Sequence, residues 1–280
     1  MRKLFDQVAM KTSTITTYKY STSFSLGIKC LHKSLHNPIC SIYGFVRFAD
    51  EIVDTFHDAP QEKLLIKFRN DTYEAIEDGI SLNPILHAFQ DTVNKYNIER
   101  ELIDTFLDSM EMDLGIKKYN STNDLKNYIL GSAEVVGLMC LRVFVHGDDE
   151  MFHKLKPFAM SLGSAFQKVN FLRDLRNDYV ELGRSYFPGF NWETFDKGTK
   201  KQIEGDILND FQMARKGIEQ LPSSSKFGVL LAYKYYLALF KKIQRKPASQ
   251  IKTERIRIPN PQKAAILCTT LISHRLNVNL

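Results

Sequence analysis

The segment YGFVRFADEIVD, which runs from Tyr43 to Asp54, carries two aspartates at a helical spacing beside an arginine. Asp50 and Asp54 are four residues apart, and Arg47 precedes the first of them by three. Residues three or four apart lie on one face of an α-helix, where like charges repel one another. Folding alone does not require this repulsion, so the pattern indicates a ligand for the carboxylates.

A second segment, QKVNFLRDLRNDYVELGRSYFP from Gln167 to Pro188, repeats the arrangement with Asp174 and Asp178. Carboxylate and amide oxygens suit Mg²⁺, which usually binds one or two carboxylates together with substrate phosphates. Two such helices therefore predict a phosphorylated substrate held between them through Mg²⁺. The same helix face also carries Gln167 and Asn170, and Arg173 adds positive charge beside the carboxylates.

The alternative for either segment alone is a solvated helix face with ion pairs one turn apart, such as Arg47 with Glu51. Both polar stripes, however, adjoin apolar residues, among them Val46 in the first and Val169 in the second. A polar stripe that borders buried surface lines a cleft. The repetition of the device on two helices favours a binding site.

The overall composition is that of a large globular chain with a modest basic excess. The 280 residues are 44% hydrophobic, and the formal net charge is +6. This length and composition fit one large core. The basic excess suits an anionic ligand or an anionic membrane surface, and no nucleic-acid recognition motif accompanies it, so we expect no nucleic-acid partner.

The four cysteines are scattered and include no CxxC pair, which indicates reduced thiols and neither a zinc site nor a disulfide framework. The N-terminal sequence MRKLFDQVAMK has charges within its apolar residues, unlike a signal peptide. No uncharged apolar run reaches the length of a membrane span. We therefore predict a cytoplasmic protein, with peripheral contact at the inner face of the membrane as an option.

Helical periodicity dominates the sequence, which predicts a single all-α domain over residues 1–280. Asn37 and Asn83 each precede a proline, as an N-cap precedes proline at the first helical position. Ser121 and Asp124 form a candidate capping box. Pro157 is expected to open a long helix that Gly183 ends. The predicted helices cover roughly 38–56, 61–79, 84 onward, 99–114, 121–145, 157–183, 227–245 (after three serines, 223–225) and a last segment after Pro261 to about 275.

The two aspartate segments resemble the signatures of squalene/phytoene synthases, and the resemblance extends from about Ser21 to Lys263. The motifs FLRDL and GRSYFP look most like those of bacterial phytoene synthases. The resemblance implies an isoprenoid-synthase helical bundle around a central cavity. It also implies Mg²⁺-dependent head-to-head condensation of two allylic diphosphates through a cyclopropyl intermediate.

The resemblance assigns expected roles at the polar end of that cavity. The metal ligands, for Mg²⁺ or alternatively Mn²⁺, would be Asp50, Asp54, Asn170, Asp174 and Asp178. Contacts to diphosphate or to metal-bound water would come from Arg47, Gln167, Asn170 and Arg173. An N-terminal pair and a C-terminal basic pair that also face diphosphate would be Ser21 with Ser23 and Arg255 with Lys263.

The resemblance likewise assigns residues to the region around the reacting carbons and to the cavity for the apolar tails. Tyrosines near the reacting carbons would be Tyr43, Tyr128 and Tyr236. The tail cavity would use Phe24, Val135, Gly137, Leu138 and Leu162. The chain also departs from the family pattern: Tyr20 and Thr22 stand where many relatives have histidine and lysine, Glu51 follows Asp50 in place of a second aspartate, and Glu134 replaces a glycine.

The resemblance leaves the product open. The leading expectation is phytoene from two geranylgeranyl diphosphates, without NADPH. The alternative is squalene or dehydrosqualene from two farnesyl diphosphates, of which only squalene formation needs NADPH. The chain shows no GxGxxG dinucleotide motif. A terpene cyclase, and an inactive relative that acts in binding or assembly, are the other hypotheses, and the sequence does not decide the oligomeric state.

Overall fold

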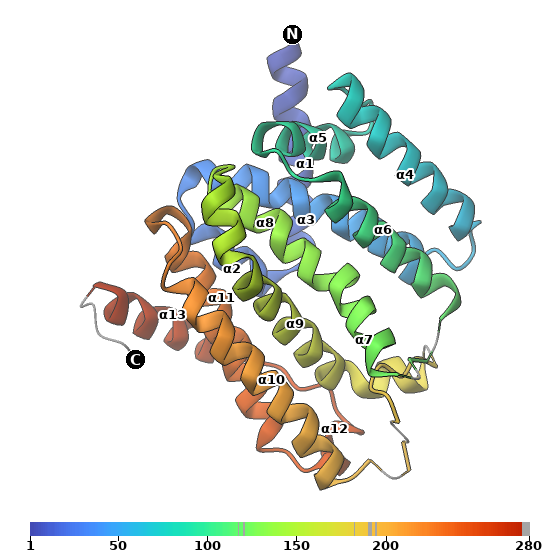
Figure 1. Cartoon of the computed structure of the whole chain (residues 1–280), viewed down its shortest axis with the longest axis vertical. Helices are drawn as coiled ribbons and strands as arrows, with labels where there is room; N and C mark the ends of the chain where they lie inside the picture. The colour runs from blue at the N-terminus through green and yellow to red at the C-terminus, as the bar shows by residue number, and fades with distance from the viewer. Residues whose placement is uncertain (117, 120, 182, 190–191, 194, 276–280) are drawn as a thin grey trace.

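The computed structural model describes the chain except for residues 117, 120, 182, 190–191, 194 and 276–280 and the side chains of Ser23, His274 and Arg275. The described residues form the helical assembly shown in Figure 1, in which Lys118 and Ser185 make an isolated β-bridge. The all-α prediction is confirmed. The elements are α1 (Arg2–Tyr20), α2 (Thr22–Lys29), α3 (Lys33–Asp54), α4 (Gln61–Asp78), α5 (Pro84–Tyr96), α6 (Arg100–Gly115), α7 (Thr122–Ile129), the π-helical turn η1 (Leu130–Glu134), α8 (Val135–Phe144), α9 (Asp149–Val180), α10 (Lys197–Ile218), α11 (Ser223–Gln244), α12 (Ala248–Ile251) and α13 (Asn260–Arg275).

Helix α9 lies in the middle of the assembly and packs against α8, η1, α10 and α11 (Figure 1). On the other side of the bundle, α3 packs against α1, α5 and α6. The core there is aromatic: the fully buried rings of Phe45 and Phe89 stack with centroids 3.9 Å apart, and Phe106 packs against Phe45. Full burial of such side chains stabilises the fold by about 1.5–3 kcal/mol each.

Two helices begin earlier than predicted. Helix α3 starts at Lys33 after His32, whose ring accepts a bond from the Ser34 N–H, so Pro38 lies inside the helix and Asn37 is not its cap. Helix α9 starts after Asp148, whose carboxylate accepts from the Met151 N–H, so Pro157 is also internal. Each helix thus begins at a side-chain cap upstream of its proline, and each proline lies inside the helix, where it removes one backbone hydrogen bond.

Some of the other helices begin as the sequence predicts, and the structure also contains helices that the sequence did not predict. Asn83 caps α5, and the predicted capping box at Ser121 and Asp124 is present. The serines at 223–225 form the first turn of α11 and do not precede it. The sequence did not predict α1, α2, α10 or the short α12. Helix α1 contains the run TSTITT, whose β-branched residues disfavour a helix, but packing against α3 and α5 stabilises it.

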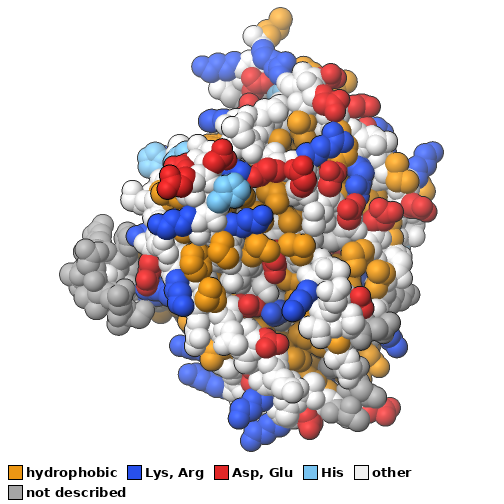
Figure 2. Space-filling model, viewed as in Figure 1, with side chains coloured by type: hydrophobic (Ala, Val, Ile, Leu, Met, Phe, Trp, Pro, Cys, Tyr) orange, Lys and Arg blue, Asp and Glu red, His pale blue; other side chains and the backbone are white. Residues whose placement is uncertain are grey.

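The stretch Thr122–Phe144 has the length and hydropathy of a membrane span, yet 56% of that window is buried inside the fold. It comprises α7, η1 and α8, and it packs against α3, α6 and α9, so we assign it to the core. On the face viewed in Figure 2, basic and acidic side chains are interspersed, with apolar side chains between them.

Helices α9 and α10 cross closely at Gly217. A Cβ atom at this position would lie 2.3 Å from the Cβ of Phe158 on α9, a distance that requires one helix to shift. Glycine is therefore needed here because of the close approach of the two helices. Gly205, on an exposed part of the same helix, has no such neighbour within 4 Å.

We predict that G217A destabilises the protein by about 1–3 kcal/mol through overpacking. G205A is the matched control on the same helix, and it should stabilise the protein by about 0.5–1 kcal/mol because alanine favours the helix. Urea unfolding followed by circular dichroism measures both. Equal stability of G217A and the wild type would show that the crossing can relax.

Candidate active site

A cavity runs along α9, with a volume of about 1220 Å³ when the open solvent at its mouth is included. Its lining on this helix follows one continuous stripe, from Leu155 through Phe158, Leu162 and Phe166 to Asn170. The other walls come from α2, α3, η1, α8, α10 and α11. The stripe is apolar except at its C-terminal end, where Gln167 and Asn170 lie. The cavity thus has a polar end and an apolar end.

Three of the five residues predicted for the tail cavity, Phe24, Gly137 and Leu162, line it. Val135 and Leu138 do not. Both are buried in the core, and Val136 and Cys140 line the cavity in their place. Both residues follow the π-helical turn η1, and their side chains face the core.

Glu134 is not among the residues that line the cavity. It ends η1 close to Lys168 on α9 and Asp210 on α10, which form an ion pair with an Nζ–Oδ2 distance of 2.8 Å. Burial, and secondarily the charge of Asp210, raises the pKa of Glu134 to about 7. The glutamate therefore belongs to a polar cluster outside the tail cavity.

The first aspartate segment presents its polar stripe from α3. Arg47 Nη1 lies 2.5 Å from Asp50 Oδ2, and the same guanidinium also contacts Glu51. The ring of Tyr20 packs under Arg47, 4.5 Å from its guanidinium carbon. Side-chain exposure is 27% for Arg47 and 33% for Asp50, which places the stripe at a partly buried edge as predicted.

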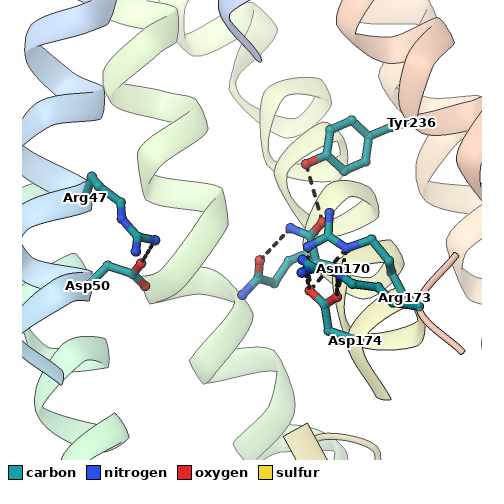
Figure 3. A network of polar contacts seen from close by, with 8 residues as sticks. Arg47, Asp50, Asn170, Arg173, Asp174 and Tyr236 are labelled. Carbon is teal, nitrogen blue, oxygen red and sulfur yellow. Dashed lines mark hydrogen bonds and ion pairs between the residues drawn. The ribbon is translucent and has the colours of Figure 1, made fainter. Parts of the chain in front are cut away.

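The second segment presents its polar stripe from α9, on the opposite side of the same space (Figure 3). Arg173 Nη2 lies 2.5 Å from Asp174 Oδ2. Asn170 Oδ1 accepts a bond of 3.4 Å from the hydroxyl of Tyr236, which comes from α11. Gln167 Oε1 accepts from Asn170, and Gln167 donates to Ser132 of η1. Of these polar residues, Gln167 and Asn170 line the polar end of the cavity, and the two segments are close enough for the charge of Asp54 on α3 to raise the pKa of Asp178 on α9.

Two residues that the sequence analysis did not assign connect the segments. Arg184 follows α9 and lies with Nη1 2.8 Å from Asp54 Oδ1, while its Nη2 donates to the backbone carbonyl of Asp113. The Asp113 side chain, on α6, accepts a bond of 3.1 Å from the Tyr128 hydroxyl, and its other carboxylate oxygen is buried without a partner. Arg184 lay within the quoted GRSYFP motif, but an isolated aspartate in α6 gave no signal.

The carboxylates raise one another's pKa values. Burial, with help from the Asp54 charge, raises the pKa of Asp50 to about 6. Burial, with help from Asp174, raises the pKa of Asp178 to about 7. For Asp113, burial is the main cause of a pKa of about 7, although Arg184 opposes it. A divalent cation would relieve this repulsion, and the donor set of carboxylate and amide oxygens fits Mg²⁺.

Arginine side chains form ion pairs with several of these carboxylates. Among the described residues, no group of three His, Cys, Asp or Glu side chains is arranged as a ready-made metal site. Burial opposes the charge of Arg184, but the carboxylates of Asp113 and Asp54 around it raise its pKa. The polar centre thus combines fixed positive charge with anionic oxygens from two facing helices.

The terminal segments reach the same region. Ser21 caps α2 by accepting a bond from the Phe24 N–H, and Ser23 lies in α2 with its side chain outside the described residues. Arg255 contacts Asp174 with an Nε–Oδ1 distance of 2.7 Å. Lys263 Nζ donates to the hydroxyl of Thr22 at 3.3 Å, which joins the C-terminal segment to α2.

The three predicted tyrosines occupy two places. Tyr43 stacks on Phe24 with ring centroids 5.5 Å apart, and Tyr236 stacks on Phe166 at 3.8 Å and lines the cavity. Tyr128 does not line the cavity. It belongs to an aromatic cluster beside Asp113, and burial raises its pKa well above the ordinary value. The rings around it are those of Tyr119, Phe171 and Tyr186.

The sequence profile of squalene/phytoene synthases matches residues 17–262. The chain belongs to the squalene/phytoene synthase family. A chloroplastic phytoene synthase 2 of Solanum lycopersicum is 27% identical over 271 residues, covering 89% of this chain and 85% of the relative. A 15-cis-phytoene synthase of a Paracoccus strain is 24% identical over 279 residues, covering 91% and 88%.

Solved structures show the same fold. A dehydrosqualene synthase crystal structure superimposes with a TM-score of 0.82 at 19% identity and covers 97% of this chain and 98% of the other. Members of the squalene/phytoene synthase family are prenyltransferase-type enzymes that act on prenyl diphosphates. The chain is therefore an enzyme of isoprenoid biosynthesis, and the converged polar centre is its candidate active site.

We predict that D113N stabilises the ligand-free protein more at pH 8 than at pH 5.5. The folded-state pKa of Asp113 is about 7 against an ordinary 3.8, so its favourable contribution is complete below pH 3.8 and is lost as the pH rises through 7. Asparagine removes the charge and keeps the oxygen that accepts from Tyr128. The gain at pH 8 should exceed that at pH 5.5 by on the order of 1–2 kcal/mol in urea unfolding. An equal gain at both pH values would contradict the assigned pKa.

Proposed function

We propose that the protein is a phytoene synthase. It condenses two geranylgeranyl diphosphates head to head, through prephytoene diphosphate, and releases diphosphate in a Mg²⁺-dependent reaction. The observation that carries the proposal is the cavity along α9, which is lined by Gln167, Asn170 and Tyr236 at the end beside the second aspartate segment and is apolar along the rest of its length. A diphosphate at the polar end places its hydrocarbon tail in that channel.

The length of the channel supports a C20 substrate. Asn170 and Leu155 both line it and are fifteen residues apart on α9, which corresponds to about 22 Å at the helical rise. With carbon–carbon bonds near 1.5 Å, the sixteen-carbon main chain of a geranylgeranyl group extends about 20 Å and the twelve-carbon chain of a farnesyl group about 15 Å. The lined stripe on α9 thus matches the length of the longer tail more closely than that of the shorter one.

The second candidate is a squalene or dehydrosqualene synthase that uses two farnesyl diphosphates. The comparisons favour it in part, because the similar structures include a dehydrosqualene synthase and a squalene synthase. A 4,4'-diapophytoene synthase of Staphylococcus haemolyticus is also 26% identical over 196 residues. Relatives from Solanum lycopersicum, a Paracoccus strain and Arthrospira platensis are, however, named as phytoene synthases.

The proposed metal ligands are Asp50 and Asp54 from α3 and Asp174 and Asp178 from α9, with the Asn170 amide oxygen. Bound Mg²⁺, or Mn²⁺ in its place, supplies Lewis-acid neutralisation of the departing diphosphate. Arg47, Gln167 and Arg173 add hydrogen-bond donors to the diphosphate oxygens from both sides. The positive charge of the guanidiniums stabilises the anion that forms when the allylic carbon–oxygen bond breaks.

Ionisation leaves an allylic cation, which the cavity walls must protect from water. The apolar lining of α2, α8 and α9 excludes water from the channel. The rings of Phe166 and Tyr236 lie where the polar end meets the channel, and an aromatic face stabilises a nearby cation. Tyrosine and phenylalanine suit this position because stronger nucleophiles would be alkylated.

A product assay tests the proposal directly. Purified protein is incubated with Mg²⁺ and either geranylgeranyl or farnesyl diphosphate, with and without NADPH, and the hydrocarbon is identified by mass. We expect a C40 product from geranylgeranyl diphosphate without NADPH. A C30 product alone would move the assignment to the farnesyl-dependent enzymes, and the absence of any hydrocarbon would favour the inactive relative.

Variants of the proposed metal ligands give a second test. D54N and D178N should each lower turnover by at least 100-fold, because each removes a charge that binds the cation, while the helical circular dichroism spectrum stays unchanged. D91N is the control, since Asp91 is an exposed residue of α5 away from the site. A chelator should stop the wild-type reaction, and added Mg²⁺ should restore it. Near-normal turnover of D54N or D178N would refute the assigned metal ligands.

A further inference from the structure

Asp174 forms ion pairs with two arginines. Arg173, its neighbour on α9, donates to both carboxylate oxygens. Arg255, 81 residues further along the chain, contacts the same two oxygens, with Nε 2.7 Å from Oδ1 and Nη2 3.3 Å from Oδ2. The exposed fraction of the Asp174 side chain is 18%. Both carboxylate oxygens of Asp174 therefore contact a local partner, Arg173, and a long-range partner, Arg255.

The backbone that carries Arg255 is fixed. We call residues 252–258, between α12 and α13, the basic strap. Ile256 is buried with 3% exposure, Lys242 of α11 donates to the backbone carbonyl of Arg257 at 2.7 Å, and Lys252 donates to the carbonyl of Trp192. The Arg255 side chain, in contrast, is 51% exposed. Its guanidinium can therefore reorient without moving the strap.

The other arginines at the site have less freedom. The Arg184 side chain is only 10% exposed and donates to both Asp54 and the Asp113 backbone. Arg47 is 27% exposed and holds two carboxylates of its own helix. Arg173 is 23% exposed. Arg255 is the arginine of this group whose side chain is mostly in solvent while its partner is mostly buried.

A carboxylate that accepts hydrogen bonds from a guanidinium offers fewer lone pairs to a cation. A cation that binds Asp174 therefore competes with Arg255 for these oxygens. The guanidinium is also well matched to diphosphate, because its planar donors pair with two phosphate oxygens at once. Diphosphate thus gives Arg255 another partner when the cation binds Asp174.

We propose that Arg255 holds Asp174 in place of the divalent cation and exchanges it for diphosphate, so that cation and diphosphate bind cooperatively. This inference rests on the proposed function, which places the cation and the diphosphate at this site. No covalent bond changes in the exchange. One ion pair, between Arg255 and Asp174, is replaced by a cation–carboxylate contact and an arginine–diphosphate contact.

Binding linkage gives this proposal a measurable form. If Arg255 competes with the cation, its removal strengthens cation binding in the absence of diphosphate. The same removal reduces the factor by which diphosphate strengthens cation binding, because the exchange no longer contributes to it. An arginine that served only to attract diphosphate would not change cation affinity in this direction.

The test measures Mg²⁺ binding to the full chain by isothermal titration calorimetry, with and without saturating inorganic pyrophosphate. R255Q removes the proposed competitor. R257Q is the matched control, because Arg257 is an exposed residue of the same strap whose guanidinium has no partner among the described residues, and its loss removes the same charge. D174N identifies the heat that arises from this site.

In the wild type, pyrophosphate should tighten Mg²⁺ binding by roughly 5- to 150-fold, the usual range of coupling between two ligands. R255Q should bind Mg²⁺ alone roughly two- to fivefold more tightly than the wild type, the range expected for a partly exposed ion pair. Its pyrophosphate coupling should fall by at least the same factor. R257Q should match the wild type in both measurements.

Unchanged or weaker binding of Mg²⁺ alone to R255Q, or an equal gain in R257Q, would overturn the exchange. The proposed function is tested separately by hydrocarbon formation in the wild type. Product formation together with a failed R255Q result would refute the exchange and leave the function in place. Absence of product, together with Mg²⁺ binding that D174N does not alter, would refute the site itself.

Discussion

Repulsion among carboxylates is the constraint on which the polar centre depends. Asp50 and Asp54 on α3 face Asp174 and Asp178 on α9, and Asp113 adds a charge from α6. The raised pKa values of Asp50, Asp113 and Asp178 report the free-energy cost of burying these carboxylates first and of holding their charges together second. Arginines reduce that cost in the ligand-free chain, and Arg184 is central because it joins Asp54 of one segment to the α6 backbone. A site that is incompletely neutralised without its ligands is suited to bind a cation and an anion together.

The surrounding helices hold this arrangement and connect it to the cavity. Helix α9 carries the second aspartate pair near its C-terminal end and the apolar wall over the preceding turns, so one rigid element sets the distance between the charged centre and the floor of the channel. Packing of α9 against α10 depends on the close approach at Gly217, and packing of α3 depends on the aromatic core around Phe45. The stability of the bundle and the geometry of the site therefore rest on the same contacts.

The sequence predicted the fold class and the converging aspartates because both are local patterns. An i, i+4 pair beside apolar residues can be recognised without knowledge of the partner helix. Asp113 and Arg184 could not be assigned from pattern, since their importance arises from tertiary proximity to Asp54 and Tyr128. The tail residues Val135 and Leu138, which the family resemblance assigned, do not line the cavity because both side chains are buried in the core. The starts of α3 and α9 were displaced because His32 and Asp148 cap the helices ahead of the prolines.

The most direct measurement is a crystal structure with Mn²⁺ and a non-ionisable thio analogue of geranylgeranyl diphosphate. Anomalous scattering should place Mn²⁺ between the aspartates of α3 and α9. The diphosphate should lie against Arg47 and Arg173, and the tail should follow α9 as far as Leu155. Metal or diphosphate bound away from both aspartate pairs, or a tail outside the channel, would contradict the assignment of the polar centre as the active site.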